Sequence, residues 1–205
     1  AKSEAENRYL GIKDKDIEVY QKMLSYLLFT PKVSIKASYD RQCPVSELWK
    51  YGISGDLPIL MVKIKDINDI DIIQEDLSAY EFFRVKNIKV DLVILNEEKE
   101  SYESYVKDAI QRAIFNRNLA SLLNIPAGIF CLENIEKKEK KLLEERANLV
   151  INAYYSSLAL QMEDIESKML DNVKETVFDA KQNNFIEVND EKENFIDEAS
   201  LKYFN

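Results

Sequence analysis

Near its centre the chain reads Pro58-Ile59-Leu60-Met61-Val62-Lys63-Ile64, an apolar run that includes β-branched side chains. Two similar runs follow at residues 90–95 and 128–132, and each run is succeeded by a polar loop and then by an amphipathic stretch. Strands that are apolar on both faces and separated by helices are typical of a parallel sheet covered on both sides. The three runs therefore predict three parallel strands joined by right-handed crossovers.

The stretches that follow the runs have the periodicity of helices. Apolar residues recur every three to four positions near 69–85, from about 101 to 123 and over 136–162. With only 4 Gly and 4 Pro in 205 residues, the composition favours long helices over a turn-rich sandwich or barrel. We expect an α/β fold: a helix-rich three-layer domain with a small, mainly parallel sheet of about three strands, flanked by extra helices.

Three regions are expected along the chain. Residues 1–44 form an N-terminal helical lead-in and loop, because a helical period over 16–29 is followed by Pro31 and a stretch without periodicity. Residues 45–162 form the α/β domain. Residues 163–205 continue as a helix and then become acidic and aperiodic, which predicts a linker to a following domain. We therefore expect the chain to be a segment of a longer protein.

Charge and hydropathy argue against two kinds of partner. The formal net charge is −9, and Lys and Arg are scattered among acidic residues, so we expect no basic face that binds nucleic acid. No run approaches the roughly 18 apolar residues of a membrane span, so this segment should not insert into a bilayer. Cys43 and Cys131 are far apart, and Cys131 lies in an apolar run where a buried, reduced thiol is expected. These features favour a cytoplasmic location.

The residue types argue against catalysis by this segment. The sequence contains no His, which rules out nucleophilic systems with an imidazole base and metal sites with imidazole ligands. The pattern Asp69-Ile70-Asp71 has the spacing by which sugar-nucleotide transferases hold a divalent metal, but it falls where a helix should begin, and acidic residues are favoured there. We expect no catalytic residue, no metal site and no cofactor in this segment.

A compact motif precedes the first apolar run. Gly52-Ile53-Ser54-Gly55-Asp56 superficially resembles the turn that presents a nucleophilic serine, yet no base is available to activate Ser54. We interpret it as a structural turn with Gly52 and Gly55 at positive φ and with Asp56 bonding its own backbone, while an anion contact through backbone amides is the alternative. Trp49, beside the turn, is expected to pack in the core or between domains, although an aromatic sugar platform is also consistent with it.

Polar side chains follow each predicted strand and are candidates for ligand binding. Asp66 comes after the first run, Asn96 and Glu97 follow the second, and Glu133 follows the third. The carboxyl ends of parallel strands meet at one edge of the sheet, where such folds bind ligands, and the position of Asp66, Glu97 and Glu133 is compatible with a place near that edge. Solvated loops with capping duties are the competing interpretation. The charged run at 136–141 is interpreted as an exposed helical face with i,i+4 ion pairs.

The stretch at 48–59, Leu48-Trp49-Lys50-Tyr51-Gly52-Ile53-Ser54-Gly55-Asp56-Leu57-Pro58-Ile59, resembles a signature of the bacterial cyclic β-1,2-glucan synthases. Residues 90–97, 101–102 and 128–130 extend the resemblance in the same order and at suitable spacing, so that it covers about 45–155. The resemblance implies a very large inner-membrane parent protein that builds β-1,2-glucan from UDP-glucose through a glycosyltransferase domain and cyclises it.

The same resemblance implies where the segment lies in that parent protein. The cytoplasmic carboxyl-terminal part of such synthases is similar to family 94 glycoside phosphorylases, with β-sandwich modules ahead of an (α/α)6 barrel. The segment would be the α/β piece between sandwich modules, and no catalytic residue of the family falls on it.

Two functions are compatible with these observations. The first is a non-catalytic module that positions neighbouring domains of the same polypeptide for glucan synthesis or length control. The second is a glucan- or sugar-nucleotide-binding module that contributes to glycosyl transfer, with β-1,2-glucan as a partner. The second function requires convergent polar groups at the strand ends, near Asp66, Asn96 and Glu133.

Overall fold

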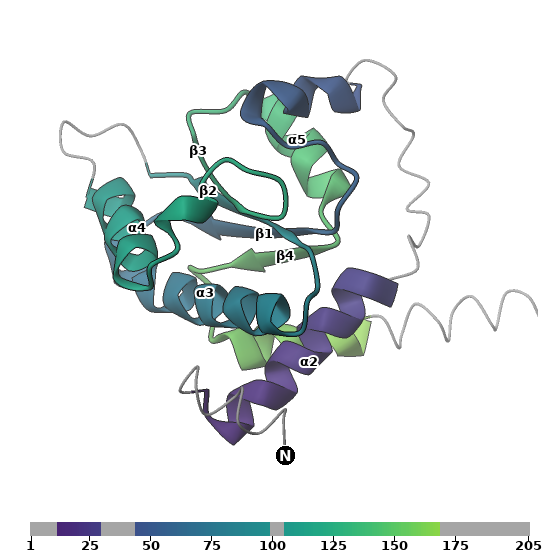
Figure 1. Ribbon diagram of the computed structural model, residues 1–205, viewed down its shortest axis with the longest axis vertical. Helices are drawn as coiled ribbons and strands as arrows, with labels where there is room; N and C mark the ends of the chain where they lie inside the picture. The colour runs from purple at the N-terminus through teal and green to yellow at the C-terminus, as the bar shows by residue number, and fades with distance from the viewer. Residues whose placement is uncertain (1–11, 30–43, 99–104, 169–205) are drawn as a thin grey trace, which may run out of the picture. The chain divides into compact units, whose positions relative to one another are not determined.

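The computed structural model describes residues 12–29, 44–98 and 105–168 (Figure 1). The chain divides into two compact units, Ala1–Met162 and Glu163–Asn205, and the sheet with its covering helices belongs to the first. The first residues of the helix predicted from about 101, and the acidic linker predicted at the end of the chain, lie outside the described residues. The expected division into three regions stays a prediction.

The centre of the unit is a four-stranded sheet in which every pair of neighbouring strands is parallel. The strand order is β3-β2-β1-β4. The bounds of the strands are Ile59–Ile64 for β1, Asp91–Asn96 for β2, Ile129–Glu133 for β3 and Leu149–Asn152 for β4. The α/β class and the parallel direction of the three predicted strands are therefore confirmed, and β4 is an addition.

Helices cover both faces of the sheet, which gives three layers (Figure 1). One face is covered by α3 and α4, which span Ile70–Val85 and Tyr105–Asn116. The opposite face is covered by α5, Lys137–Arg146, and by the 3-10 helix η1, Val45–Tyr51. Helix α2, Asp14–Phe29, contacts α3 and β4, and short 3-10 turns lie at Ile67–Asp69 and Ala120–Leu122. Among the described residues, none of the helices combines the length and the apolar character that crossing a membrane requires.

Two helices end earlier than their sequence pattern predicted. Helix α4 stops at Asn116, and the chain reverses through Asn118, whose φ is +57°, a conformation that Asn tolerates at helix ends. The predicted helix over 136–162 is wrong as a single element. Helix α5 ends at Arg146, Ala147 is extended, and β4 then pairs with β1, for example Val150 with Met61. A second helix occupies 158–168.

Apolar side chains are buried on both faces of the sheet, and one core cluster lies on the face that carries η1 and α5. Strand residues that point to this face, such as Met61, Val93 and Phe130, are fully buried against Leu48 of η1 and Leu143 of α5. The alternate residues, such as Leu60, Val62 and Leu92, are equally buried and, by the alternation of side chains along a strand, point to the opposite face, which α3 and α4 cover. Burial on both faces explains why these strands are apolar throughout rather than alternating.

Asp76 is an exception to the apolar interior. It lies in α3 with only 1% of its surface exposed, and neither carboxylate oxygen has a hydrogen-bond partner among the described residues. Burial raises the pKa of Asp76 well above its ordinary value of 3.8, and the nearby Glu75 raises this pKa further. The folded chain therefore keeps a proton that the unfolded chain releases, so this group lowers stability as pH rises above about 4.

Replacing Asp76 with Asn should raise the free energy of unfolding at pH 7 by roughly 1–3 kcal/mol, because the amide cannot ionise in this apolar site. Urea unfolding of both chains between pH 3 and pH 8 measures the effect. The gain should shrink as pH falls towards 4, where the unfolded carboxyl also takes up its proton. A constant difference across this range would contradict the assignment.

Candidate functional site

The carboxyl ends of the strands bring together part of the predicted site. Asn96 is the last residue of β2, and in the sheet register it lies between Ile64 of β1 and Glu133 of β3. Glu97 follows directly, and its backbone N–H donates to the carbonyl of Ile64. Asp66 lies two residues beyond β1 and is exposed. The parallel register therefore makes Asn96 and Glu133 neighbours at the carboxyl edge of the sheet.

Two of the candidate carboxylates have structural partners. The side chain of Asp66 accepts a hydrogen bond from the backbone N–H of Asn68 and caps the 3-10 turn that precedes α3. Glu97 is nearly buried and forms an ion pair with Lys140 of α5, and its other oxygen lies 3.9 Å from Lys65. These contacts tie the ends of β1 and β2 to their covering elements, as the competing interpretation of capping and loop contacts predicts.

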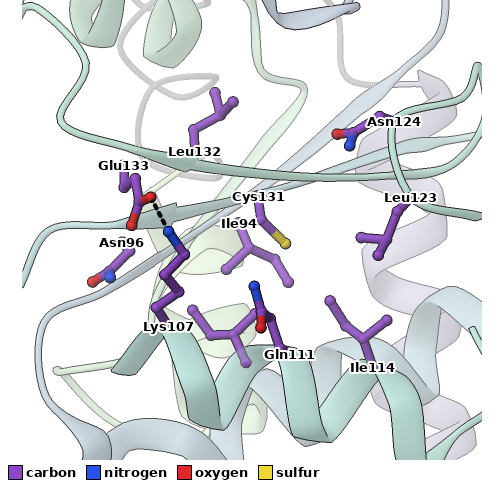
Figure 2. A pocket seen from close by; sticks show the side chains of 11 residues that line it. Ile94, Asn96, Lys107, Gln111, Ile114, Leu123, Asn124, Cys131, Leu132 and Glu133 are labelled. Atoms are coloured by element: carbon purple, nitrogen blue, oxygen red, sulfur yellow. Dashed lines mark hydrogen bonds and ion pairs between the residues drawn. The ribbon is translucent and has the colours of Figure 1, made fainter. Parts of the chain in front are cut away.

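Asn96 and Glu133 instead line a hollow between α4 and the edge strand β3, with a volume of about 240 Å³ (Figure 2). Its lining comes from the carboxyl halves of β2 and β3, from α4 and from the loop after η3. Residues of both polar and apolar character line it: Ile94, Asn96, Lys107, Ile110, Gln111, Ile114, Leu123, Asn124, Cys131, Leu132 and Glu133. This hollow is the candidate binding site.

The two ends of the hollow differ in chemistry. At one end Lys107 of α4 forms an ion pair with Glu133, beside Asn96, and hydrogen bonding to Glu133 raises the pKa of Lys107 (Figure 2). At the other end Leu123 and Ile114 form an apolar wall. The polar end therefore offers a charged donor, a carboxylate acceptor and an amide within one small space.

Cys131 lies in the middle of the hollow, between the two ends (Figure 2). The sequence predicted a buried thiol, and this prediction is wrong: Cys131 is exposed, because β3 is an edge strand and this position opens onto the hollow. Its apolar surroundings still raise the pKa of the thiol to about 11, and Glu133 adds to the shift. Cys131 is therefore accessible but only weakly nucleophilic near neutral pH.

The glycine motif lies at the opposite end of β1. Gly52 and Gly55 have φ of +80° and +79°, which confirms the predicted backbone conformation of the turn. The predicted role of Asp56 is wrong: the backbone N–H of Asp56 donates to the hydroxyl of Ser54, at 3.2 Å, and so Ser54 stabilises the turn. Trp49 is 64% exposed, so the expected core packing is also wrong, and packing between domains stays a prediction.

The sequence pattern did not identify the buried acid that binds η1, the element directly before this motif. Glu139 of α5 is 1% exposed, and its carboxylate accepts from the ammonium of Lys50 and, at 2.6 Å, from the hydroxyl of Tyr51. The hydrogen bond from Lys50, followed by that from Tyr51, lowers the pKa of Glu139. Glu139 also completes the capping box at the start of α5 with Glu136. The run at 136–141 is therefore not uniformly exposed, although Lys141 and Glu145 do form an i,i+4 pair.

Part of the chain is similar in sequence to an enzyme of glucan synthesis. No protein-family model matches the chain. In an alignment of 129 positions that covers 61% of the chain, it is 31% identical to the cyclic β-(1,2)-glucan synthase NdvB of Rhizobium meliloti strain 1021. The chain is related to that synthase over this region. It spans 4% of the length of NdvB.

Proposed function

We propose that this chain is a non-catalytic α/β module of a protein that makes β-1,2-glucan, and that it positions neighbouring domains for glucan synthesis or length control. The relationship to NdvB supports the link to glucan synthesis. One observation favours a positioning role over ligand binding: two of the candidate carboxylates already have structural partners. Asp66 caps a 3-10 turn, and Glu97 forms an ion pair with Lys140. The same applies to Glu139, whose carboxylate joins η1 to α5.

In this proposal the module lies in the cytoplasmic part of a membrane-anchored glycosyltransferase. There it would separate β-sandwich modules ahead of a family 94 phosphorylase-like barrel. Its partners are the neighbouring domains of the same polypeptide, without a role for nucleic acid or for direct membrane insertion.

A domain replacement tests this function. Exchanging the matching region of NdvB for that of this chain should preserve formation of cyclic β-1,2-glucan in cells, because a positioning module is replaceable by one of the same fold. A second chimera with Gly128→Ala, a change that should prevent folding of the module, serves as the negative control. A chimera that accumulates normally and forms no glucan contradicts the proposal.

A turnover assay separates this function from catalysis by the module itself. The chain alone should release no UDP from UDP-glucose, and it should form no glucose 1-phosphate from β-1,2-glucan and phosphate. Turnover that is lost on replacing Glu97 with Gln would show that the module is catalytic and would overturn the proposal.

The hollow between α4 and β3 favours a second candidate function, which is binding of glucan by the same module. It lies at the carboxyl end of the strands, where parallel sheets hold their ligands, and it presents Asn96, Lys107 and Glu133 together. The two functions are compatible, because a module that positions neighbouring domains can also bind the sugar chain on which those domains act.

A further inference from the structure

The hollow has a chemistry that selects one kind of ligand. We propose that it binds a single neutral sugar ring, the end unit of a β-1,2-linked glucose chain, with Lys107 as donor and Glu133 as acceptor to neighbouring hydroxyls. This inference rests on the glucan-binding function proposed above and adds the ligand and the residues that recognise it.

The charge balance of the lining favours a neutral ligand. The two ionisable side chains at the polar end are Lys107 and Glu133, which have opposite charges and already pair with each other. A nucleoside diphosphate would need cations in excess, and its phosphates would be repelled by Glu133. Hydroxyl groups can accept from the ammonium and donate to the carboxylate at the same time, so a sugar satisfies both partners without a net charge.

The size of the hollow favours one ring over a chain. Its volume of about 240 Å³ lies below the range of roughly 300–1,000 Å³ that is usual for sites of drug-sized ligands. The remainder of a glucan chain would extend out over the exposed side of β3. A terminal ring in this place is therefore the largest part that the site encloses.

The remaining walls fit the mixed surface of a sugar ring. Ile110 and Ile114 of α4 and Leu123 provide an aliphatic wall for the C–H groups of the ring. Gln111 projects towards the middle of the hollow beside Cys131 (Figure 2) and offers a further donor and acceptor. None of the lining residues is aromatic, so the affinity should be modest, with a dissociation constant on the order of 1 mM.

Cys131 provides a direct reporter of occupancy, because it lies between the polar and apolar ends. In the Cys43→Ser chain, which leaves a single thiol, the rate of Cys131 alkylation by iodoacetamide is measured at pH 9. The β-1,2-linked glucose disaccharide at 20 mM should slow this reaction at least fivefold, because an occupied hollow blocks the sulfur. UDP-glucose and glycerol at the same concentration serve as the charged and the nonspecific comparison, and each should slow it less than twofold.

Variants show whether the Lys107–Glu133 pair recognises the sugar or only supports the fold. Lys107→Met should abolish the protection by the disaccharide, whereas Lys141→Met, which removes a lysine from an ion pair on α5, should leave it unchanged. The double exchange Lys107→Glu with Glu133→Lys keeps an ion pair but swaps the positions of the donor and the acceptor. If the pair recognises the sugar, the disaccharide should no longer protect Cys131, while the unfolding midpoint stays unchanged. A role limited to the fold predicts full protection.

Each result decides the inference. Protection by the disaccharide that is lost in Lys107→Met and in the exchange variant supports it. It is overturned by an unchanged alkylation rate, by equal protection from glycerol, by stronger protection from UDP-glucose, or by protection that survives the exchange. If the domain replacement in NdvB still yields glucan while the alkylation rate is unchanged, only the sugar site is wrong and the positioning function stands.

Discussion

Replacing Gly128 with Ala should cost on the order of 5 kcal/mol or more, enough to leave the chain largely unfolded. A Cβ at this position would lie 2.5 Å from the carbonyl oxygen of Ile125 and closer still to that of Leu122. Both obstacles are backbone atoms, so no side-chain rotation relieves the overlap. Urea unfolding followed by circular dichroism measures the loss, and a variant within about 1 kcal/mol of the parent chain would contradict it.

The surrounding loop cannot move away because it is bonded at several points. The backbone N–H of Ala127 donates to buried Asp91 at 2.8 Å, and the hydroxyl of Tyr80 donates to the carbonyl of Ala127 at 2.6 Å. The backbone N–H of Asn124 donates to the carbonyl of Ile129 at 2.9 Å. These bonds hold the chain against the start of β3, where Gly128 must fit.

Gly52→Ala is the matched control. Gly52 has a φ of +80°, and a Cβ there would meet the ring edge of Phe130 at 3.3 Å. The left-handed conformation costs a residue with a side chain about 1–2 kcal/mol, and the aromatic ring can shift by the small distance needed. Gly52→Ala should therefore remain folded with a lower unfolding midpoint. The difference between the two variants separates conformational strain from steric exclusion.

Replacing Glu139 with Ala should lower the free energy of unfolding by about 2–4 kcal/mol at pH 7. The change removes the acceptor of Tyr51 and Lys50 and the capping box at the start of α5, and it leaves a small cavity beneath η1. Because η1 carries buried Leu48, the loss should also loosen the packing of η1 on the sheet. Thermal or urea unfolding measures the change. Glu145→Ala, an exposed change on the same helix, should alter stability by less than about 0.5 kcal/mol.

The contribution of Glu139 should depend on pH in a defined direction. Its pKa in the folded chain is lowered, first by Lys50 and then by Tyr51, so the folded state releases this proton more readily than the unfolded state. The stabilisation is thus complete above the ordinary value of 4.5 and is lost as pH falls through the lower folded value. A difference between the parent chain and Glu139→Ala that stays constant down to pH 2 would contradict this account.

The sequence by itself determined the parts of the fold that depend on local pattern. The run at 58–64 is apolar at almost every position, a pattern that a strand covered on both faces accommodates, and most of its side chains are buried. The runs at 90–95 and 128–132 behave alike, and the helical stretches between them leave parallel crossovers as the simplest connection. The placement of Asn96 beside Glu133 depends in addition on the strand order, which puts β2 next to β3 and which local pattern does not determine.

Only the tertiary structure decided the fourth strand. Residues 149–152 lie within a pattern that is compatible with a helix, and they become β4 because β1 offers an unpaired edge on the side away from β2. Val150 and Ile151 are β-branched and follow Asn148, which is the local signal that could have indicated a strand. This local preference is weak, and the strand forms because residues 149–152 pair with β1, which is far away in the sequence.

The site and the buried acids also depend on contacts between distant residues. Glu139 meets Lys50 and Tyr51 across 89 and 88 positions, and Lys107 meets Glu133 across 26. A charged run such as 136–141 has the same local pattern whether its residues face water or a partner, so periodicity cannot identify the one that is buried. Local pattern therefore determines where the first three strands form and that they run parallel. Long-range packing decides which polar side chains are buried and which line the hollow between α4 and β3.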